Sequence, residues 1–214
     1  YTVSPWDVVE ILAQKITGRS ENTVNTTVIW DIRMPRILLA MLAGAGLSVS
    51  GAAFQGCFHN PLVSPDMLGV SAGAGFGAAL GILLTNETGA FTAGLSFAMG
   101  LSSVFLSWFL SRIRKDGGTL SLVLAGVIVS AVFNALISFV KLVADTDSQL
   151  PAITFWLMGS LNGTTFRVLA SAVVPIAVGI GLLLAMRWQI NILTLGDDEA
   201  RSLGINPVRV RMLV

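Results

Sequence analysis

Residues 33–81 of the chain read RMPRILLAMLAGAGLSVSGAAFQGCFHNPLVSPDMLGVSAGAGFGAALG. Two apolar, glycine-rich segments flank one short loop in this stretch, and no charged residue occurs between Arg36 and Asp66. Apolar sequence of this length is typical of helices in lipid, where a charge would be costly. The stretch therefore predicts two neighbouring membrane helices rather than the core of a soluble domain.

The composition of the whole chain indicates the same class of protein. Hydrophobic residues make up 54% of the 214 positions and charged residues 12%, whereas a soluble domain carries about 25% charged residues. Five uncharged runs each contain roughly 18 residues or more, enough for a helix to cross about 30 Å of hydrocarbon. The runs are Ile37–Phe54, Met67–Thr85, Gly89–Ser111, Gly117–Val140 and Val168–Met186. One run alone is compatible with a buried helix of a soluble protein, but five predict an all-α, polytopic membrane bundle with five full transmembrane helices.

Polar segments divide the chain into four parts. Residues 1–30 are polar, residues 31–191 form the helical bundle, residues 192–210 are polar again, and residues 211–214 start another apolar run. Ser4 as a cap and Pro5 at the first helical position predict a helix start, the apolar spacing after them predicts a short amphipathic helix, and Gly18 predicts its end. We predict that this helix lies at the membrane surface, with an ordinary water-exposed helix as the alternative. Because the chain lacks an initial Met and stops in an apolar run, we expect a fragment of a longer protein.

Small residues recur at every fourth position in the first two runs. Gly69, Gly73, Gly77 and Gly81 form an unbroken series in the second run, and Gly44 begins a similar series in the first. Glycine is costly in an isolated helix, but a stripe of small residues lets a neighbouring membrane helix approach closely. We therefore predict that these five glycines mediate helix packing.

Three polar side chains share one face of the fourth run. Ser130, Asn134 and Ser138 are spaced by four residues, and such a stripe either hydrogen-bonds to a neighbouring helix or lines an aqueous path. Between residues 148 and 166, prolines and glycines interrupt the apolar sequence too often for a span that faces lipid. The pattern predicts a short re-entrant or surface helix around Pro151–Met158, because irregular backbone at membrane depth must be shielded.

The second polar segment has the charge pattern of a short exposed helix. Residues 195–204 read LGDDEARSLG, with acids in the first turn and Arg201 in the last, where each complements the helix dipole. Gly204 predicts the end of this helix and Asn206-Pro207 the start of the next. The segment is longer than a usual connection of about 4–6 residues. We therefore favour a docking surface for a soluble partner, with a plain connector as the alternative.

Several patterns that other functions require are missing. The sequence contains no G-x-x-x-x-G-K-[ST] motif, so we do not expect this chain to hydrolyse ATP or to act as an enzyme. Cys57 and His59 offer a pair of ligands where a metal site needs more, and no basic tract indicates nucleic-acid binding. None of the five runs contains a charge, which argues against an ion-coupled carrier.

Three ordered blocks of the sequence resemble the permease subunits of the FecCD family. The first block contains Arg33, Pro35, Arg36, Gly44-Ala45, Ser50-Gly51, Gln55, Asn60, Pro61, Leu62, Pro65, Leu68-Gly69 and Ser71–Ala74. The second block is Trp156–Leu161 and the third is Leu195–Gly204. The family comprises membrane components of ATP-binding cassette (ABC) importers for iron–siderophore complexes, haem and vitamin B12. Gln55, Asn60, Pro61, Leu62 and Pro65 would form the family's loop motif.

The resemblance implies an orientation and partners. It implies that the five runs correspond to the second to sixth helices of the family, with residues 1–30 extracytoplasmic. Residues 192–210 would be a cytoplasmic coupling segment that docks on an ATP-binding subunit. The further implied partners are a second permease copy, an extracytoplasmic substrate-binding protein and the lipid of a prokaryotic inner membrane, crossed several times. ATP and Mg²⁺ would bind the partner subunit, so no cofactor and no metal are expected on this chain.

Residue roles follow from the same resemblance. The coupling residues would be Gly196, Asp197, Asp198, Glu199, Ala200, Arg201, Ser202, Leu203 and Gly204. Ser130, Asn134, Ser138 and Pro151 are candidates for the translocation path and its outer gate. The expected substrate is an iron–siderophore-type chelate, with haem or cobalamin as alternatives. Two functions of other classes stay open: an ion-coupled secondary carrier and a non-transporting membrane scaffold.

Overall fold

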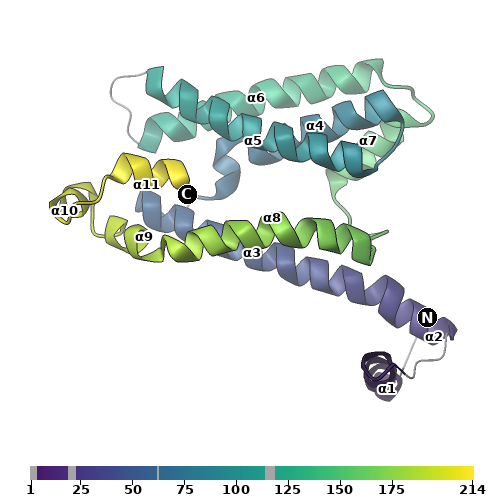
Figure 1. Ribbon diagram of the computed structural model, residues 1–214. Coiled ribbons are helices and arrows are strands. Elements are labelled where there is room, and N and C mark those ends of the chain that lie inside the picture. The colour runs from purple at the N-terminus through teal and green to yellow at the C-terminus, as the bar shows by residue number, and fades with distance from the viewer. Residues whose placement is uncertain (1–3, 19–22, 62, 114–118) are drawn as a thin grey trace. The chain divides into compact units, whose positions relative to one another are not determined.

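The computed structural model describes residues 4–18, 23–61, 63–113 and 119–214, and all regular elements in these ranges are helical (Figure 1). They are α1 (Pro5–Ile16), α2 (Val24–Thr26), the π-helical η1 (Thr27–Arg33), α3 (Met34–Phe58), the 3-10 turn η2 (Pro65–Leu68), α4 (Val70–Thr85), α5 (Ala90–Ile113), α6 (Thr119–Val143), α7 (Gln149–Met158), α8 (Phe166–Ala185), α9 (Arg187–Leu193), α10 (Asp197–Ser202) and α11 (Pro207–Leu213). The chain divides into two compact units. The first unit is Tyr1–Ala53 with Leu161–Val214, and the second unit is Phe54–Ser160.

Four helical stretches of the described chain are long and apolar enough to span a membrane. They are Val24–Phe58, Ala90–Ile113, Leu120–Val143 and Phe166–Ala185. Their apolar side chains are largely uncovered: no residue is buried in an apolar stretch of 18 residues within α8, and only 11% of residues are buried in such a stretch of Val24–Phe58. Exposed apolar surface on this scale needs lipid to cover it. The predicted class, an all-α polytopic membrane protein, is confirmed.

The second predicted span, Met67–Thr85, is shorter than expected. It is divided at Gly69, whose φ of +78° lies in the left-handed region that favours glycine, into η2 and a 16-residue α4. At 1.5 Å per residue such a helix is roughly 24 Å long, less than the 30 Å of a typical hydrocarbon core. Gly69 is thus a junction between two elements, whereas the sequence pattern predicted it to be the first member of a continuous stripe.

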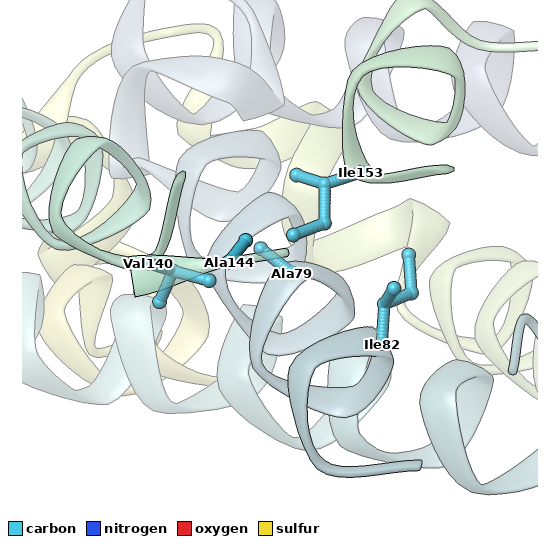
Figure 2. Packing of buried hydrophobic residues seen from close by; sticks show 5 residues of the cluster. All are labelled: Ala79, Ile82, Val140, Ala144 and Ile153. Carbon is cyan, nitrogen blue, oxygen red and sulfur yellow. The ribbon is translucent and has the colours of Figure 1, made fainter. Parts of the chain in front are cut away.

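The core of the second unit lies where α4, α6 and α7 meet. Figure 2 shows the buried residues of this cluster: Ala79, Ile82, Val140, Ala144 and Ile153. The side chains of Ile82 on α4 and Ile153 on α7 have no solvent exposure. Full burial of an isoleucine is worth about 1.5–3 kcal/mol. The cluster therefore holds the short α7 helix against α4.

Within the first unit, α3 and α8 run side by side (Figure 1). A Cβ atom built on Gly46 would lie 3.2 Å from the side chain of Ile176, so the lack of a side chain at Gly46 allows the two helices to approach closely here. The rings of Trp30 of η1 and Phe166 at the start of α8 are in contact in a tilted arrangement, with their centroids 5.6 Å apart. Two separate contacts, Gly46 with Ile176 and Trp30 with Phe166, therefore join Val24–Phe58 to α8.

The amphipathic α1 helix has the predicted bounds but not the predicted cap. Ser4 occupies the N-cap position and is extended, yet its side chain makes no capping hydrogen bond. Gly18, with φ of +72°, follows the helix end as predicted. Trp6 is 80% exposed, whereas Ile11 on another face is buried. Because exposed Trp favours the boundary between water and lipid, the surface location of α1 stays our prediction.

Candidate functional site

The polar segment after α8 forms a compact helical hairpin, α10–α11, supported by α9. The three helices contact one another, and each contributes buried side chains: Ile192, Leu193, Ala200, Pro207 and Val210. Leu193 and Ala200 have no solvent exposure. With Ile205 of the turn, the 27 residues Arg187–Leu213 bury six apolar side chains, so they form a packed substructure rather than a loose connection.

The turn of the hairpin is fixed by the residues that the sequence pattern singled out. Gly204, with φ of +79°, donates its N–H to the carbonyl of Arg201 at 3.0 Å, and Ile205 donates to Ala200 at 2.9 Å. These two bonds form a Schellman motif, which needs a left-handed residue at the position of Gly204. The side chain of Asn206 then accepts the N–H of Arg209 at 3.2 Å and caps α11.

The charged side chains of α10 fall into two groups. Arg211 of α11 donates two hydrogen bonds to the carboxylate of Asp197, at 2.9 and 2.6 Å. Asp198, Glu199 and Arg201 remain exposed, and Arg201 approaches Asp198 at 3.8 Å. The sequence led us to assign all four charges to a partner; in the structure Asp197 is bound within the hairpin. The pairing of Arg211 was missed, since Arg211 and Asp197 lie on different helices and helical spacing does not relate them.

The uncharged residues of α10 have distinct environments. Gly196 precedes the helix with φ of +129°, and Ala200 faces the buried side. Ser202 donates its hydroxyl to the carbonyl of Asp198 at 3.0 Å, while Leu203 is 57% exposed. The surface that α10 presents to solvent is therefore mixed, with two acids, one base and one leucine.

The polar stripe on α6 is partly covered. Ser130 is half-buried, and a Cβ atom built on Gly69 would lie 2.8 Å from its Oγ. Asn134 and Ser138 are exposed, and Ser138 donates its hydroxyl to the Asn134 carbonyl at 3.0 Å. Ser130 therefore lies at a helix contact, whereas Asn134 and Ser138 lie on a face of α6 that the described residues leave uncovered.

The N-terminal end of α7 is tied to the C-terminal end of α4 by one glutamine. Nε2 of Gln149 donates to the carbonyl of Leu83 at 3.2 Å and also to Oδ1 of Asn86, and its Oε1 accepts the N–H of Asp145 at 3.1 Å. Leu83 carries one of the carbonyls that a helix end leaves unpaired. Pro151 lies exposed in the first turn of α7. Nothing in the sequence pattern marked Gln149.

Asp145 organises the turn that leads into α7. Its carboxylate accepts the hydroxyl of Ser148 at 2.7 Å and the N–H of Ser148 at 2.8 Å. These hydrogen bonds lower the pKa of Asp145 below its usual value, and the bond from the Ser148 hydroxyl has the largest effect. The carboxylate is therefore ionised at neutral pH and holds the turn before α7. The backbone carbonyl of Asp145 accepts the N–H of Leu150 at 2.9 Å in the first turn of α7, where the Ser148 side chain makes no capping bond.

We predict that Gln149→Leu loosens α7 while α4 keeps its fold. The substitution leaves the Leu83 carbonyl and the Asp145 N–H without this partner, at a cost of about 1 kcal/mol. Hydrogen exchange of the α7 amides measures the effect and is expected to become several times faster. Thr154→Ala on the same helix, which removes only a bond to the Leu150 carbonyl, is the control. Equal exchange in both variants would contradict an anchoring role for Gln149.

The glycine series of α4 lies against α5. A Cβ atom on Gly73 would lie 2.6 Å from the Met99 carbonyl oxygen, one on Gly77 would overlap the Leu95 carbonyl, and one on Gly81 would lie 2.8 Å from Thr92 Cα. The facing residues on α5 are themselves small and buried: Thr92, Ser96, Gly100, Ser103 and Ser107. The sequence pattern contained this second stripe, at spacings of three and four, and we missed it. Gly44, by contrast, faces open space.

The loop motif surrounds the start of η2. Gln55, Asn60 and Pro61 are exposed, and the Asn60 carbonyl accepts the N–H of Val63 at 3.2 Å. Pro65 occupies the first position of η2. Leu62 lies outside the described residues. Ser107 of α5 donates its buried hydroxyl to the Leu68 carbonyl at 2.9 Å, so η2 is bonded to α5.

Gly126 of α6 is a further close contact that the sequence analysis missed. A Cβ atom at this position would overlap the carbonyl oxygen of Met67, because α6 passes directly over η2. The only signal in the sequence was an isolated glycine inside an apolar run, which is weak evidence for a close approach.

These features define a polytopic helical membrane protein with a packed, charged hairpin after its last described span. The sequence pattern of the FecCD transport family matches residues 1–214, and the chain belongs to this family. Among solved structures it resembles an inward-facing ABC transporter assigned to the metal-chelate type, with a TM-score of 0.79 and 31% identity over 98% of this chain and 72% of that one. The resemblance found in the sequence is confirmed.

Curated relatives carry several substrate names. The chain is 39% identical, over its full length, to the molybdate import system permease protein MolB of Haemophilus influenzae. It is 38% identical over 87% of its length to a probable iron chelatin transport system permease protein of Helicobacter pylori. Other relatives are named for cobalamin and hemin transport. The chain spans 63% and 56% of the length of the first two relatives.

Proposed function

We propose that this chain is part of the membrane-spanning permease subunit of an ABC importer in a prokaryotic inner membrane. The observation that carries the proposal is the match of all 214 residues to a transport family whose relatives are named as import permeases. The proposal includes an ATP-binding subunit, a second permease copy and a substrate-binding protein as partners. ATP and Mg²⁺ belong to the ATP-binding subunit, and this chain performs no hydrolysis.

Within the hairpin α10–α11, the exposed face of α10 is the proposed contact to the ATP-binding subunit, and α11 packs against α10 to support it. The buried side chains of the hairpin make it stiff, and Asp198, Glu199 and Arg201 give it an exposed surface that a soluble partner can recognise by charge. When ATP binding closes the partner subunits, the hairpin moves with them. The movement reaches the membrane helices through α9, which packs against α10 and follows α8 directly.

The proposed path lies along α6 and α7. Asn134 and Ser138 present exposed neutral polar groups on α6, and α7 forms the outer gate. Its N-terminal end is anchored by Gln149 and Ile153, while Gly159 at its other end has φ of +77° and permits a sharp change of direction. This arrangement supports alternating access, in which α7 swings about a fixed end.

The proposed substrate is an iron–siderophore-type chelate, with haem and cobalamin as alternatives of the same kind. Molybdate is a second candidate, because the MolB relative matches the full length of the chain. The exposed amide of Asn134 can donate hydrogen bonds to an oxyanion or to the polar surface of a chelate. The hydroxyl proton of Ser138 is already bonded to the Asn134 carbonyl, so its oxygen can only accept a hydrogen bond from a chelate.

Uptake into proteoliposomes that contain the complete transporter tests the proposed function. The assay compares a radiolabelled ferric siderophore with radiolabelled molybdate, with and without ATP on the cytoplasmic side. We expect accumulation of one of them that requires ATP and is unaffected by a protonophore. Accumulation driven by an ion gradient without ATP would identify a secondary carrier. If neither compound accumulates, and haem and cobalamin do not accumulate either, the result supports a non-transporting membrane scaffold.

A further inference from the structure

We propose that Asp197 and Arg211 form an internal clasp that positions the docking face of α10, and that neither residue is a contact for the partner. This inference rests on the proposed function and deepens it, because it separates the residues that shape the coupling hairpin from those that touch the ATP-binding subunit. The observation behind it is the paired hydrogen bond between the first residue of α10 and the end of α11.

The clasp closes the open end of the hairpin. Figure 1 shows α10 and α11 joined by a short turn, and the Schellman bonds at Gly204 fix that turn. At the opposite end, Nη1 and Nη2 of Arg211 donate to Oδ2 and Oδ1 of Asp197 at 2.9 and 2.6 Å. The two helices are therefore connected covalently at one end and by a bidentate ion pair at the other.

The environment of the pair distinguishes it from an ordinary surface ion pair. The side chains of Arg211 and Asp197 are 18% and 39% exposed, whereas those of Arg201 and Asp198 are 63% and 94% exposed and lie 3.8 Å apart. A bidentate, partly desolvated arginine–carboxylate pair has a defined geometry and strength, while an exposed pair contributes little. Removing one member of the inner pair leaves the other charge poorly compensated.

The geometry assigns separate tasks to neighbouring acids. Asp197 faces α11, so its carboxylate is already occupied, whereas Asp198 and Glu199 face solvent. Ala200, between the two sides, is buried against the hairpin. A rotation of α10 about its axis would bury the exposed acids and free Asp197, and the clasp opposes that rotation. Asp197 and Arg211 are thus positioning residues for a docking surface formed by others.

A charge-swap series in the complete permease tests the clasp. The variants are Asp197→Arg, Arg211→Asp and the double exchange, with Arg209→Asp, an exposed position on α11, as the control. The first readout is the affinity of the folded permease for its ATP-binding subunit. The second is hydrogen exchange of the α10 amides in the permease alone, which does not depend on any partner.

We expect each single variant to lower the affinity about tenfold, within the usual range of coupling between sites, and to speed exchange in α10. The double exchange should restore the affinity to within about threefold of the starting protein; the reversed charge at the start of α10 opposes the helix dipole and prevents full rescue. Arg209→Asp should change neither readout.

Two results would overturn the clasp. If the single variants weaken binding and the double exchange does not restore it, Asp197 or Arg211 contacts the partner directly. If affinity and exchange stay unchanged in all variants, the pair positions nothing. If the unsubstituted permease binds no ATP-binding subunit, that result counts against the proposed function and not against the clasp. Hydrogen exchange of the α10 amides then tests the clasp by itself: faster exchange in the single variants supports it, and unchanged exchange overturns it.

Discussion

Gly77→Leu is expected to prevent the second unit from packing, and Gly77→Ala to destabilise it by about 1–3 kcal/mol. A Cβ atom at Gly77 would lie 2.8 Å from both the carbonyl carbon of Leu95 and Cα of Ser96, and would overlap the Leu95 oxygen. All three atoms belong to the backbone of α5, so no side-chain rotation relieves the contact. The measurement is thermal unfolding of the purified protein in detergent.

Gly94→Ala is the matched control for this prediction. Gly94 lies on α5 in the same unit, and a Cβ atom there meets nothing within 4 Å. Alanine is the better helix former by about 1 kcal/mol, so Gly94→Ala should leave stability unchanged or raise it. If the same substitution lowers stability at Gly77 and raises it at Gly94, close packing and not helix propensity determines the change in stability. Equal effects would contradict the packing described for α4 and α5.

The double variant Glu199→Lys with Arg201→Glu is expected to lower transport more than tenfold while the protein still folds. Both side chains are exposed, and substitutions at such positions usually change stability by less than about 0.5 kcal/mol. A reversed charge pattern at a complementary interface brings like charges together, and each 1.4 kcal/mol of lost binding is about tenfold. ATP hydrolysis and uptake, measured in the same proteoliposomes, should become uncoupled.

A charge reversal elsewhere on the hairpin separates coupling from a general effect of charge. Arg209→Glu changes an exposed residue of α11 that is not one of the predicted coupling residues Gly196–Gly204, and transport should persist in that variant. Unchanged transport in the Glu199/Arg201 variant would remove α10 from the coupling pathway.

Local signals in the sequence predicted the hairpin well. The acids that begin α10, the glycine that ends it and the Asn206-Pro207 start of α11 each act within one helical turn, so they can be read from neighbouring residues. The lengths of α3, α5, α6 and α8 followed from uncharged runs for a similar reason, since hydrophobicity over some twenty residues does not depend on distant contacts.

Features that depend on distant residues were not predictable. Gln149 contacts Leu83 across 66 positions, and Arg211 contacts Asp197 across 14; each pair joins two different helices, so spacing along the sequence does not relate its members. Gly69 continues the spacing of a packing stripe, but the preceding 3-10 turn places it in the left-handed region and divides the predicted span. One spacing of glycines can therefore encode either close packing or a break in the helix.

Co-purification of the complete permease with its ATP-binding subunit tests the central claim most directly. It compares the intact chain with a variant in which Gly196–Asn206 is replaced by a Gly/Ser linker of equal length. We expect the intact chain to retain the ATP-binding subunit, and the variant, still folded in its membrane helices, to lose it. Failure of the intact chain to retain the subunit, or retention by both proteins, would contradict the assignment of α10 as the contact to the ATP-binding subunit.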